Sequence, residues 1–212
     1  MQRTRIKICG ITRAEDAATA VAAGADAIGV IFAPSPRQVS VEQAAAILAA
    51  VPPLVARVGV FVDAPSEEIA SAVAACGLTA VQLSGAESPE FCDTLPIPVV
   101  KVLHVGTDFP VDTGEPYRGH ANAVLLDTLA TDKAGGTSQC FDWQAVGELP
   151  GWAPSIVAGG LNPENVGACI TALRPFAVDV SSGVESAPGI KNHERIAQFC
   201  AAVRRADQEA SS

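Results

Sequence analysis

The stretch RIKICGIT at residues 5–12 joins the end of one segment to the start of another. Ile6 and Ile8 alternate with Lys7 and Cys9, and this period of two is typical of a β-strand. Gly10 interrupts the strand, and helical residues follow soon after. A strand that leads through a short loop into a helix is the repeating unit of a parallel α/β fold.

The same order of strand and helix repeats along all 212 residues. Eight strands in this length favour an α/β fold closed into a single (β/α)8 TIM barrel over an open sheet. We expect one domain over residues 1–212, with an irregular fifth crossover at 106–122 and a frayed tail at about 206–212. Strands are expected at 5–9, 26–32, 55–62, 80–84, 98–104, 123–127, 155–159 and 177–181. Helices are expected near 13–23, 41–50, 66–76, 88–94, 142–147, 163–172 and 193–205.

Three helix starts carry capping signals. Thr12 with Glu15 has the pattern of a capping box, and Asn162 before a proline is a typical N-cap. Asn192 is placed to cap the last helix. The alternation within the strands also assigns faces: aliphatic residues suit the helix-covered side, and the polar ones suit the lumen and its C-terminal mouth.

Composition narrows the classes of function. The net charge of −9 argues against a nucleic-acid partner, because an acidic chain repels phosphate backbones. The six cysteines lack metal-ligand spacing, and no apolar run reaches the length of a membrane span. Without a signal peptide to imply export, free thiols suggest a reduced, cytoplasmic protein.

Cys9 and Asp127 each end a predicted strand, which makes them candidates for a base and an acid. Cys9 is also the kind of small apolar residue that fills a core, but its position before a glycine and beside Lys7 favours a catalytic role. Asp127 could instead cap the turn that follows it. Asp179, on the eighth strand, is as well explained by a structural role as by a functional one.

Two neighbouring loops suit a phosphate group. Gly159 and Gly160 stand between a strand and a helix, where backbone amides are exposed at the positive end of the helix. The next strand is followed by Ser181, Ser182 and Gly183. Loops after strands 7 and 8 are the usual phosphate site of this barrel.

Further candidates lie on other loops. Arg37, in the loop after the second strand, could bind a carboxylate with its planar guanidinium. Lys101 shares a strand face with Val99 and Leu103, and we interpret it as pointing inward. The small-residue loop at 134–138 could cover a ligand, or be a mobile surface loop without a role.

These motifs together resemble the phosphoribosylanthranilate isomerase family of tryptophan biosynthesis. The resemblance runs from residue 7 to about residue 199. It is carried by KICGIT (7–12), GADAIGVIF (24–32), SPR.VS (35–40), RVGVFV (57–62), VQL.G (81–85), LLDT (125–128), FDW (141–143), GGLNPENV (159–166) and VDVSSGVES.PG.K (178–191).

The resemblance implies a monomeric or homodimeric barrel that needs no metal or organic cofactor. Its substrate is N-(5-phosphoribosyl)anthranilate, a phosphorylated small molecule. The family's general base falls on Cys9, its general acid on Asp127 and its carboxylate-binding arginine on Arg37, while the phosphate loops fall on the two glycine-containing loops described above. For the reaction, the pKa of Asp127 should be raised by burial and that of Cys9 lowered by a cation such as Lys7.

The family commonly has a histidine where this chain has Ser84, so no imidazole is available there. Two other functions remain open at this point. A related isomerase of histidine biosynthesis carries an aspartate where this chain has Cys9, and the thiol argues against it. A non-catalytic phosphate-binding barrel would bind ligand without turnover, and the retained acid and base argue against that.

Overall fold

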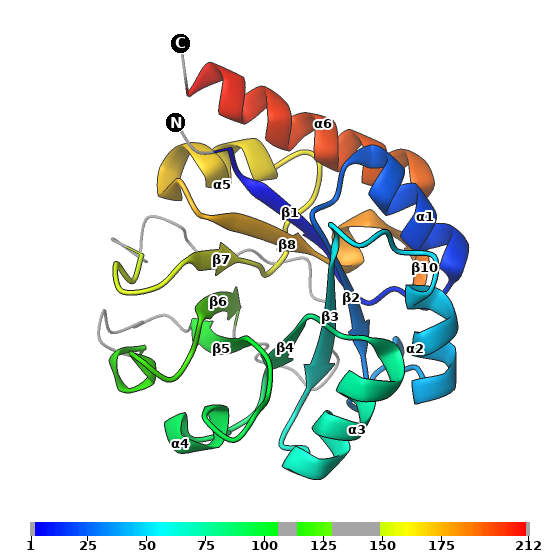
Figure 1. Ribbon diagram of the computed structural model, residues 1–212. Helices are drawn as coiled ribbons and strands as arrows, with labels where there is room; N and C mark the ends of the chain where they lie inside the picture. Colours follow the sequence, from blue (N-terminus) through cyan, green and yellow to red (C-terminus); the bar gives the residue numbers. More distant parts are fainter. Residues whose placement is uncertain (1–2, 106–113, 129–148, 211–212) are drawn as a thin grey trace.

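Eight parallel strands close into a barrel in the computed structural model, which describes residues 3–105, 114–128 and 149–210. Each strand pairs with the next along the chain, and the eighth pairs with the first, so the predicted TIM-barrel fold is confirmed (Figure 1). The strands are β1 (Arg5–Ile8), β2 (Ala27–Ile31), β3 (Ala56–Phe61), β4 (Ala80–Leu83), β5 (Val99–Val105), β6 (Ala123–Thr128), β7 (Ser155–Val157) and β8 (Ala177–Val180).

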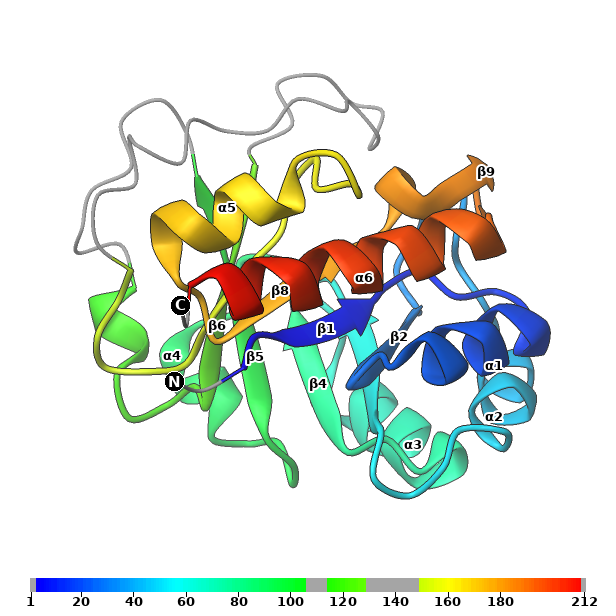
Figure 2. The same ribbon diagram turned by 90° about the horizontal axis from the view of Figure 1, so that it is seen from above.

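The helices surround the barrel, and α5 and α6 lie side by side over β1 and β8 (Figures 1 and 2). Within the described ranges, no helix is both long and apolar enough to cross a membrane. The helices are α1 (Ala14–Ala23), α2 (Val41–Leu48), α3 (Ser66–Cys76), α4 (Pro89–Cys92), α5 (Val166–Leu173) and α6 (His193–Glu209). Short elements are the 3₁₀ turns η1 (Glu115–Tyr117) and η2 (Ser182–Val184) and the hairpin β9 (Glu185–Ala187) with β10 (Ile190–Lys191).

Strand alternation divides the core into two layers, and the predicted faces hold except on β3. There Val60 pairs in register with the lumen-facing Gln82, and Phe61 instead packs in the outer layer. The outward-facing Ile6, Ile8 and Val178 are buried against the helices. The lumen holds a separate small cluster to which Leu125 and Ala123 belong. Burial of aliphatic residues on both faces of each strand stabilises the barrel and fixes which polar residues face its axis.

Lys101 does not point into the lumen as expected. It pairs in register with the outward-facing Leu83, and its ammonium donates to Glu87 at 2.7 Å and to the carbonyl of Gly85 at 2.6 Å. The residue shares its face with Val99, which belongs to the outer core. Its charge is therefore used in a buried ion pair that holds the loop after β4.

Two of the three predicted caps are wrong. The hydroxyl of Thr12 donates to the carbonyl of Gly189 instead of capping α1, because the hairpin β9–β10 lies against this loop. The side chain of Asn162 accepts from the amide of Asn165 at 3.0 Å, which forms a turn and delays the start of α5 to Val166. Asn192 caps α6 as predicted, by accepting from a backbone amide at 3.0 Å.

The tail expected to fray from residue 206 is helical up to Glu209. Ala206 is 4% exposed, and the carboxylate of Asp207 accepts from the amide of Thr4 at 2.9 Å and from its hydroxyl at 2.7 Å. These bonds tie the two ends of the chain together, and the termini lie near each other in Figures 1 and 2. Tertiary contacts therefore order a polar segment that appears unstructured from composition alone.

The described part of the fifth crossover, residues 114–122, contains the turn η1 and no α-helix, in line with the predicted irregular segment. The remaining residues of that crossover, 106–113, lie outside the described residues. The predicted helix at 142–147 and the small-residue loop at 134–138 lie outside them as well.

Candidate active site

Cys9 lies at the C-terminal end of β1, in the mouth of the barrel, and is 5% exposed. Gly29 on β2 makes room for it, because a Cβ atom there would lie 2.9 Å from the Cys9 sulfur. Gly10 has a φ of 69° and bends the chain sharply after the thiol. A Cβ atom at Gly10 would lie 2.6 Å from Cδ of Arg37, so the arginine stem packs directly beside this turn.

A buried ion pair stands next to the thiol. Lys7 and Asp179 are neighbours in the β1–β8 ladder, and their Nζ and Oδ2 atoms lie 2.9 Å apart. The Lys7 ammonium also donates to Oε1 of Gln82 at 2.9 Å. The second oxygen of Asp179, Oδ1, is buried and has no hydrogen-bond partner among the described residues. A buried acceptor of this kind is costly unless a ligand satisfies it.

The pKa of Cys9 departs from the expectation in direction. Burial raises the pKa of the thiol above its ordinary value, and the attraction of the Lys7 charge opposes this rise without reversing it. For Lys7, burial is the strongest single influence and acts to lower the pKa, but the charges and hydrogen bonds of Asp179 and Cys9 together outweigh it and the net shift is upward. The cation beside the thiol thus favours its charged form, while the thiol itself favours its neutral form.

Asp127 lies near the end of β6, three strands from β1 around the barrel, and is partly exposed. It pairs in register with His104 on β5, so both residues face the mouth. The His104 ring nitrogen Nε2 lies 3.2 Å from the carbonyl oxygen of Ser84. Cys9 and Asp127 therefore both line the same end of the barrel, as expected from their places at strand ends.

The two predicted phosphate loops pack against each other. Gly159 and Gly160 have φ angles of 81° and 67°, a backbone conformation that favours glycine. A Cβ atom at Gly183 would lie 1.9 Å from the carbonyl oxygen of Leu161, so only glycine fits there. Gly160, Ser182, Gly183 and Arg195 are among the residues that line a pocket of about 300 Å³. Gly159 and Ser181 flank this pocket and are not part of its lining.

Arg37 reaches the mouth, but its guanidinium already binds a carboxylate of this chain. Its Nε and Nη2 atoms donate to the two oxygens of Glu185, each at 2.7 Å. Lys191 donates to the same carboxylate at 2.9 Å and to the carbonyl of Ser181 at 3.0 Å. All three charged side chains are nearly buried, and together they carry one net positive charge.

Glu185 and Lys191 are the functional candidates that sequence reasoning missed. Both belong to the motif VDVSSGVES.PG.K, yet neither has a role in the sequence-based site. A glutamate in a loop suited to phosphate was the available signal, since a carboxylate near an anion site needs compensating cations. Gln82 and Gly29 were missed because their roles depend on packing across strands.

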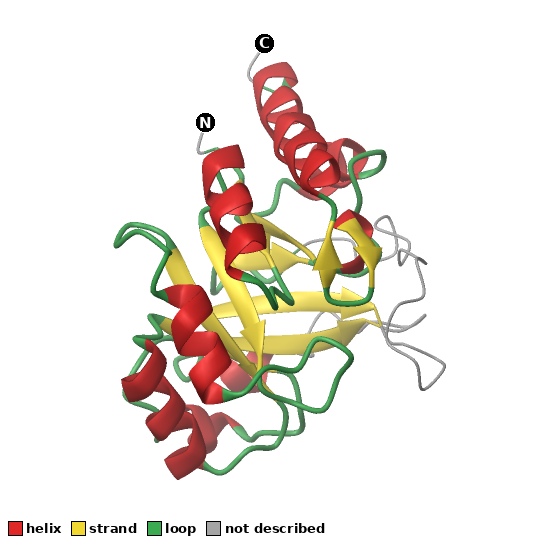
Figure 3. Ribbon diagram, turned by 90° about the vertical axis from the view of Figure 1, so that its right-hand side faces the viewer, coloured by secondary structure: helices red, strands yellow, loops and turns green. Residues whose placement is uncertain are grey.

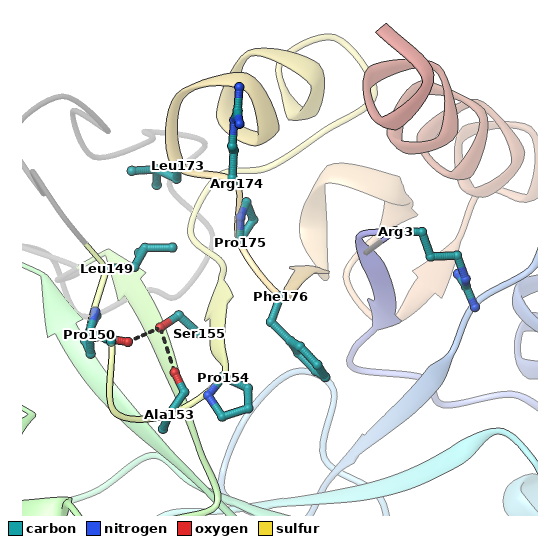
Figure 4. A pocket seen from close by; sticks show the side chains of 11 residues that line it. Arg3, Leu149, Pro150, Ala153, Pro154, Ser155, Leu173, Arg174, Pro175 and Phe176 are labelled. Carbon is teal, nitrogen blue, oxygen red and sulfur yellow. Dashed lines mark hydrogen bonds between the residues drawn. The ribbon is translucent and has the colours of Figure 1, made fainter. Parts of the chain in front are cut away.

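A second pocket, of about 380 Å³, lies at the opposite end of the barrel. It is lined by residues before the starts of β7 and β8, among them Pro154 and Phe176. Figure 4 shows Ser155 donating to the carbonyls of Pro150 and Ala153, at 3.3 and 3.5 Å. Barrels of this kind keep their chemistry at the C-terminal end of the strands, so this pocket is not the candidate active site.

Among the described residues, no group of three or more histidine, cysteine or acidic side chains is arranged to hold a metal ion. The mouth instead gathers a thiol, a carboxylate and two loops that favour an anion, and Figure 3 shows the β9–β10 hairpin beside the ends of the barrel strands. These features define the class of (β/α)8-barrel enzymes that use side-chain acid–base chemistry on phosphorylated substrates.

Comparison with known proteins identifies the family within that class. The family model of N-(5'-phosphoribosyl)anthranilate (PRA) isomerase matches residues 6–202. A curated isomerase of this name from Pseudomonas fluorescens (strain SBW25) is 47% identical over 206 residues, covering 96% of this chain and 97% of that protein. The crystal structure of the Thermotoga maritima enzyme has a TM-score of 0.87 at 43% identity, covering 95% of this chain and 99% of the other.

A second solved structure, of phosphoribosyl anthranilate isomerase in complex with reduced 1-(o-carboxyphenylamino)-1-deoxyribulose 5-phosphate, has a TM-score of 0.84 at 41% identity. It covers 95% of this chain and 99% of its own. The chain belongs to the N-(5'-phosphoribosyl)anthranilate isomerase family. It is an isomerase of tryptophan biosynthesis, so the comparisons favour this function over the histidine-pathway alternative.

Proposed function

We propose that Cys9 is the general base and Asp127 the general acid of an Amadori rearrangement at the mouth of the barrel. The substrate is N-(5-phosphoribosyl)anthranilate, and the product is 1-(2-carboxyphenylamino)-1-deoxyribulose 5-phosphate. The observation that carries this proposal is the position of Cys9. Its sulfur lies close to Gly29 of β2 and interacts with the charged Lys7, and the buried oxygen of Asp179 without a described partner is on the neighbouring strand.

Two proton transfers, one to the ring oxygen and one from C2, lead to the final tautomerisation, in which C1 gains a proton and the C2 hydroxyl loses one. Asp127 protonates the furanose ring oxygen, and the ring opens to a Schiff base. Cys9, as thiolate, then removes the proton from C2, which gives an enolamine that tautomerises to the ketone. General acid–base catalysis of this kind requires one protonated and one deprotonated group in the same site.

The thiolate of Cys9 depends on Lys7. Because burial raises the pKa of Cys9, the neutral thiol predominates in the free protein at neutral pH. The Lys7 charge lowers the cost of removing the thiol proton and stabilises the thiolate during the reaction. Lys7 therefore acts both as a support for the base and, together with Asp179, as part of the substrate-binding surface.

The other polar groups of the site each bind a different part of the substrate. Oδ1 of Asp179, a buried acceptor without a described partner, accepts a hydrogen bond from a sugar hydroxyl. Arg37 retains three N–H donors after binding Glu185, and these bind the anthranilate carboxylate. The phosphate binds at the loops after β7 and β8, which supply Gly159, Gly160, Ser181, Ser182 and Gly183.

The ligand class, the compartment and the oligomeric state follow from the same proposed function. The ligand is a phosphorylated small molecule, since a relative of this family is known in complex with such a compound. We infer that the whole chain, residues 1–212, is a single domain that acts in the cytoplasm as a monomer or homodimer. A dimeric form is known for the Thermotoga maritima relative.

Replacing the proposed acid and base tests the mechanism. Cys9→Ala and Asp127→Asn should each lower turnover by about 10²- to 10⁴-fold, because each removes one of the two proton transfers. Turnover is followed by the loss of anthranilate-type fluorescence from freshly made substrate. Cys92→Ala is the matched control, since this thiol is equally buried but lies on α4, and its turnover should stay near that of the unmodified protein. Near-normal turnover of Cys9→Ala would refute the base assignment.

A further inference from the structure

Glu185 is an acidic residue in a site built for anions. It lines the same pocket as Gly160, Ser182 and Gly183, although a carboxylate there repels a phosphate. Its side chain is 5% exposed, so the charge is also costly to bury. A residue with these two costs needs a compensating role.

Its contacts show what the carboxylate holds. Both oxygens bind Arg37 in a bidentate pair at 2.7 Å, and Lys191 binds one of them at 2.9 Å. The Lys191 side chain is 0% exposed and also donates to the carbonyl of Ser181, at the end of β8. Burial acts to raise the pKa of Glu185, but the hydrogen bonds from Arg37 and Lys191 keep it below its ordinary value, so the carboxylate is charged.

The bidentate pair fixes the plane of the guanidinium. Because Glu185 occupies the Nε edge of Arg37, the remaining N–H groups are held in one direction. The stem of Arg37 is confined from the other side by Gly10, where a Cβ atom would lie 2.6 Å from Cδ. A free arginine side chain would have to lose its rotamer freedom upon binding, whereas this one is already ordered.

We propose that Glu185 is a positioning residue, which aims Arg37 at the aromatic carboxylate of the substrate, and that Lys191 anchors Glu185 to the end of β8. This inference rests on the proposed carboxylate-binding role of Arg37 and extends it. The loop after β8 then serves two parts of the substrate, since it binds the phosphate and also sets the direction of carboxylate recognition.

The test compares two stable ligands, namely reduced 1-(o-carboxyphenylamino)-1-deoxyribulose 5-phosphate and the same compound without the ring carboxylate. Glu185→Gln retains at most one of the two bonds to Arg37, because its amide nitrogen is a donor. We expect it to weaken binding of the carboxylate ligand by about 10- to 100-fold and that of the other ligand by less than about 3-fold. With substrate, KM should rise in the same proportion, with a smaller change in kcat.

Glu164→Gln is the matched control. Glu164 is also held by an arginine through two contacts, at 3.2 and 2.9 Å to Arg195, but it does not touch Arg37. The ratio of the two affinities should be unchanged in this variant. In an Arg37→Ala background, Glu185→Gln should cause no further selective loss, since the two residues act as one unit.

The outcomes are distinguishable. Equal weakening of both ligands by Glu185→Gln would mean that the residue only supports the loop, and this would overturn the inference. Tighter binding of the carboxylate ligand would mean that Glu185 competes with it, which would also overturn the inference. If Arg37→Ala itself leaves the affinity ratio unchanged, the proposed role of Arg37 fails, independently of Glu185.

Discussion

The two ends of the barrel use charge in opposite ways. At the C-terminal mouth, the ion pairs Lys7–Asp179 and Arg37–Glu185 are nearly inaccessible to solvent. At the N-terminal end, the Arg3 side chain is 64% exposed and pairs with Asp26 at the surface. Pairs at the two ends therefore differ in energy, because water screens the exposed one and leaves the buried ones strongly coupled.

This difference indicates what each end contributes. At the N-terminal end, the polar side chains of Ser155 and Asp207 are paired within the chain, and the bond of Asp207 to Thr4 ties the two ends of the chain together. The mouth retains a buried Asp179 oxygen without a partner among the described residues, and a turn in which Gly159 and Gly160 both have positive φ angles. A buried acceptor without a partner lowers stability, and its place in the mouth marks that end as the functional one.

The largest effect is expected from Lys7→Met. Loss of the ammonium leaves the Asp179 carboxylate buried without its cation, and this should destabilise the protein by about 3–5 kcal/mol. Turnover should also fall by about 10²-fold or more, because the thiolate of Cys9 loses its nearest positive charge. Chemical denaturation and steady-state kinetics measure the two effects.

The double variant Lys7→Met/Asp179→Asn separates stability from function. It removes both charges, so most of the lost stability should return, while turnover should remain low. Recovery of turnover in the double variant would contradict the role of Lys7 beside the thiol.

A smaller but selective effect is expected from Gly183→Ala. The added Cβ would meet the carbonyl oxygen of Leu161 at 1.9 Å, so the two phosphate loops must separate. KM should rise by about 10- to 100-fold, since displacement of the loops by a fraction of an ångström misplaces the phosphate-binding amides. Gly151→Ala, at the N-terminal end, meets nothing within 4 Å and serves as the control with unchanged KM. An equal change in both variants would refute the distinction between the two ends.

The acid stability of the mouth should depend on Glu185. Since its pKa in the folded protein lies below the ordinary value of 4.5, the unfolded chain binds the proton more readily. The stability that Glu185 contributes is fully present at pH values above 4.5, the pKa in the unfolded chain. It is lost as the pH falls through the lower pKa of the folded protein. We expect Glu185→Gln to cost about 1–3 kcal/mol at neutral pH, with the difference shrinking in acid. Denaturation series at several pH values test this, and a difference that is constant with pH would contradict it.

The smallest effect is expected from Arg3→Ala. Its pair with Asp26 should contribute less than about 1 kcal/mol, because the Arg3 side chain is 64% exposed and water screens its charge. Turnover and KM should not change, although Arg3 lines the pocket of about 380 Å³ at the N-terminal end of β7 and β8. A marked loss of activity would show that the N-terminal pocket takes part in function.

Much of the fold could be predicted from local sequence. The alternation in residues 5–9 and in the other strands follows from the two-residue period of β-structure, and eight such units in this length closed into a barrel. Cys9, Asp127 and the glycine loops were predicted at the mouth because strand ends and glycine positions can be seen without tertiary contacts. Their chemical roles remain proposals.

Prediction from local sequence failed where hydrogen-bond partners come from distant parts of the chain. The side chain of Thr12 bonds across to Gly189, and the tail near Asp207 is ordered by Thr4. The direction of the Cys9 pKa shift depends on burial by surrounding strands, which outweighs the nearby Lys7. These outcomes depend on the balance between burial and contacts that are fixed only once the barrel has closed.

The sequence by itself determined which residues alternate, which strands end in chemistry-bearing side chains and where glycine permits a sharp turn. Only the tertiary structure decided that Glu185 and Lys191 join Arg37, and that Asp179 shares Lys7 with Gln82. The physical reason is that backbone periodicity depends on residues a few positions apart in the sequence. Buried charges instead pair with residues that are distant in the sequence and close in space.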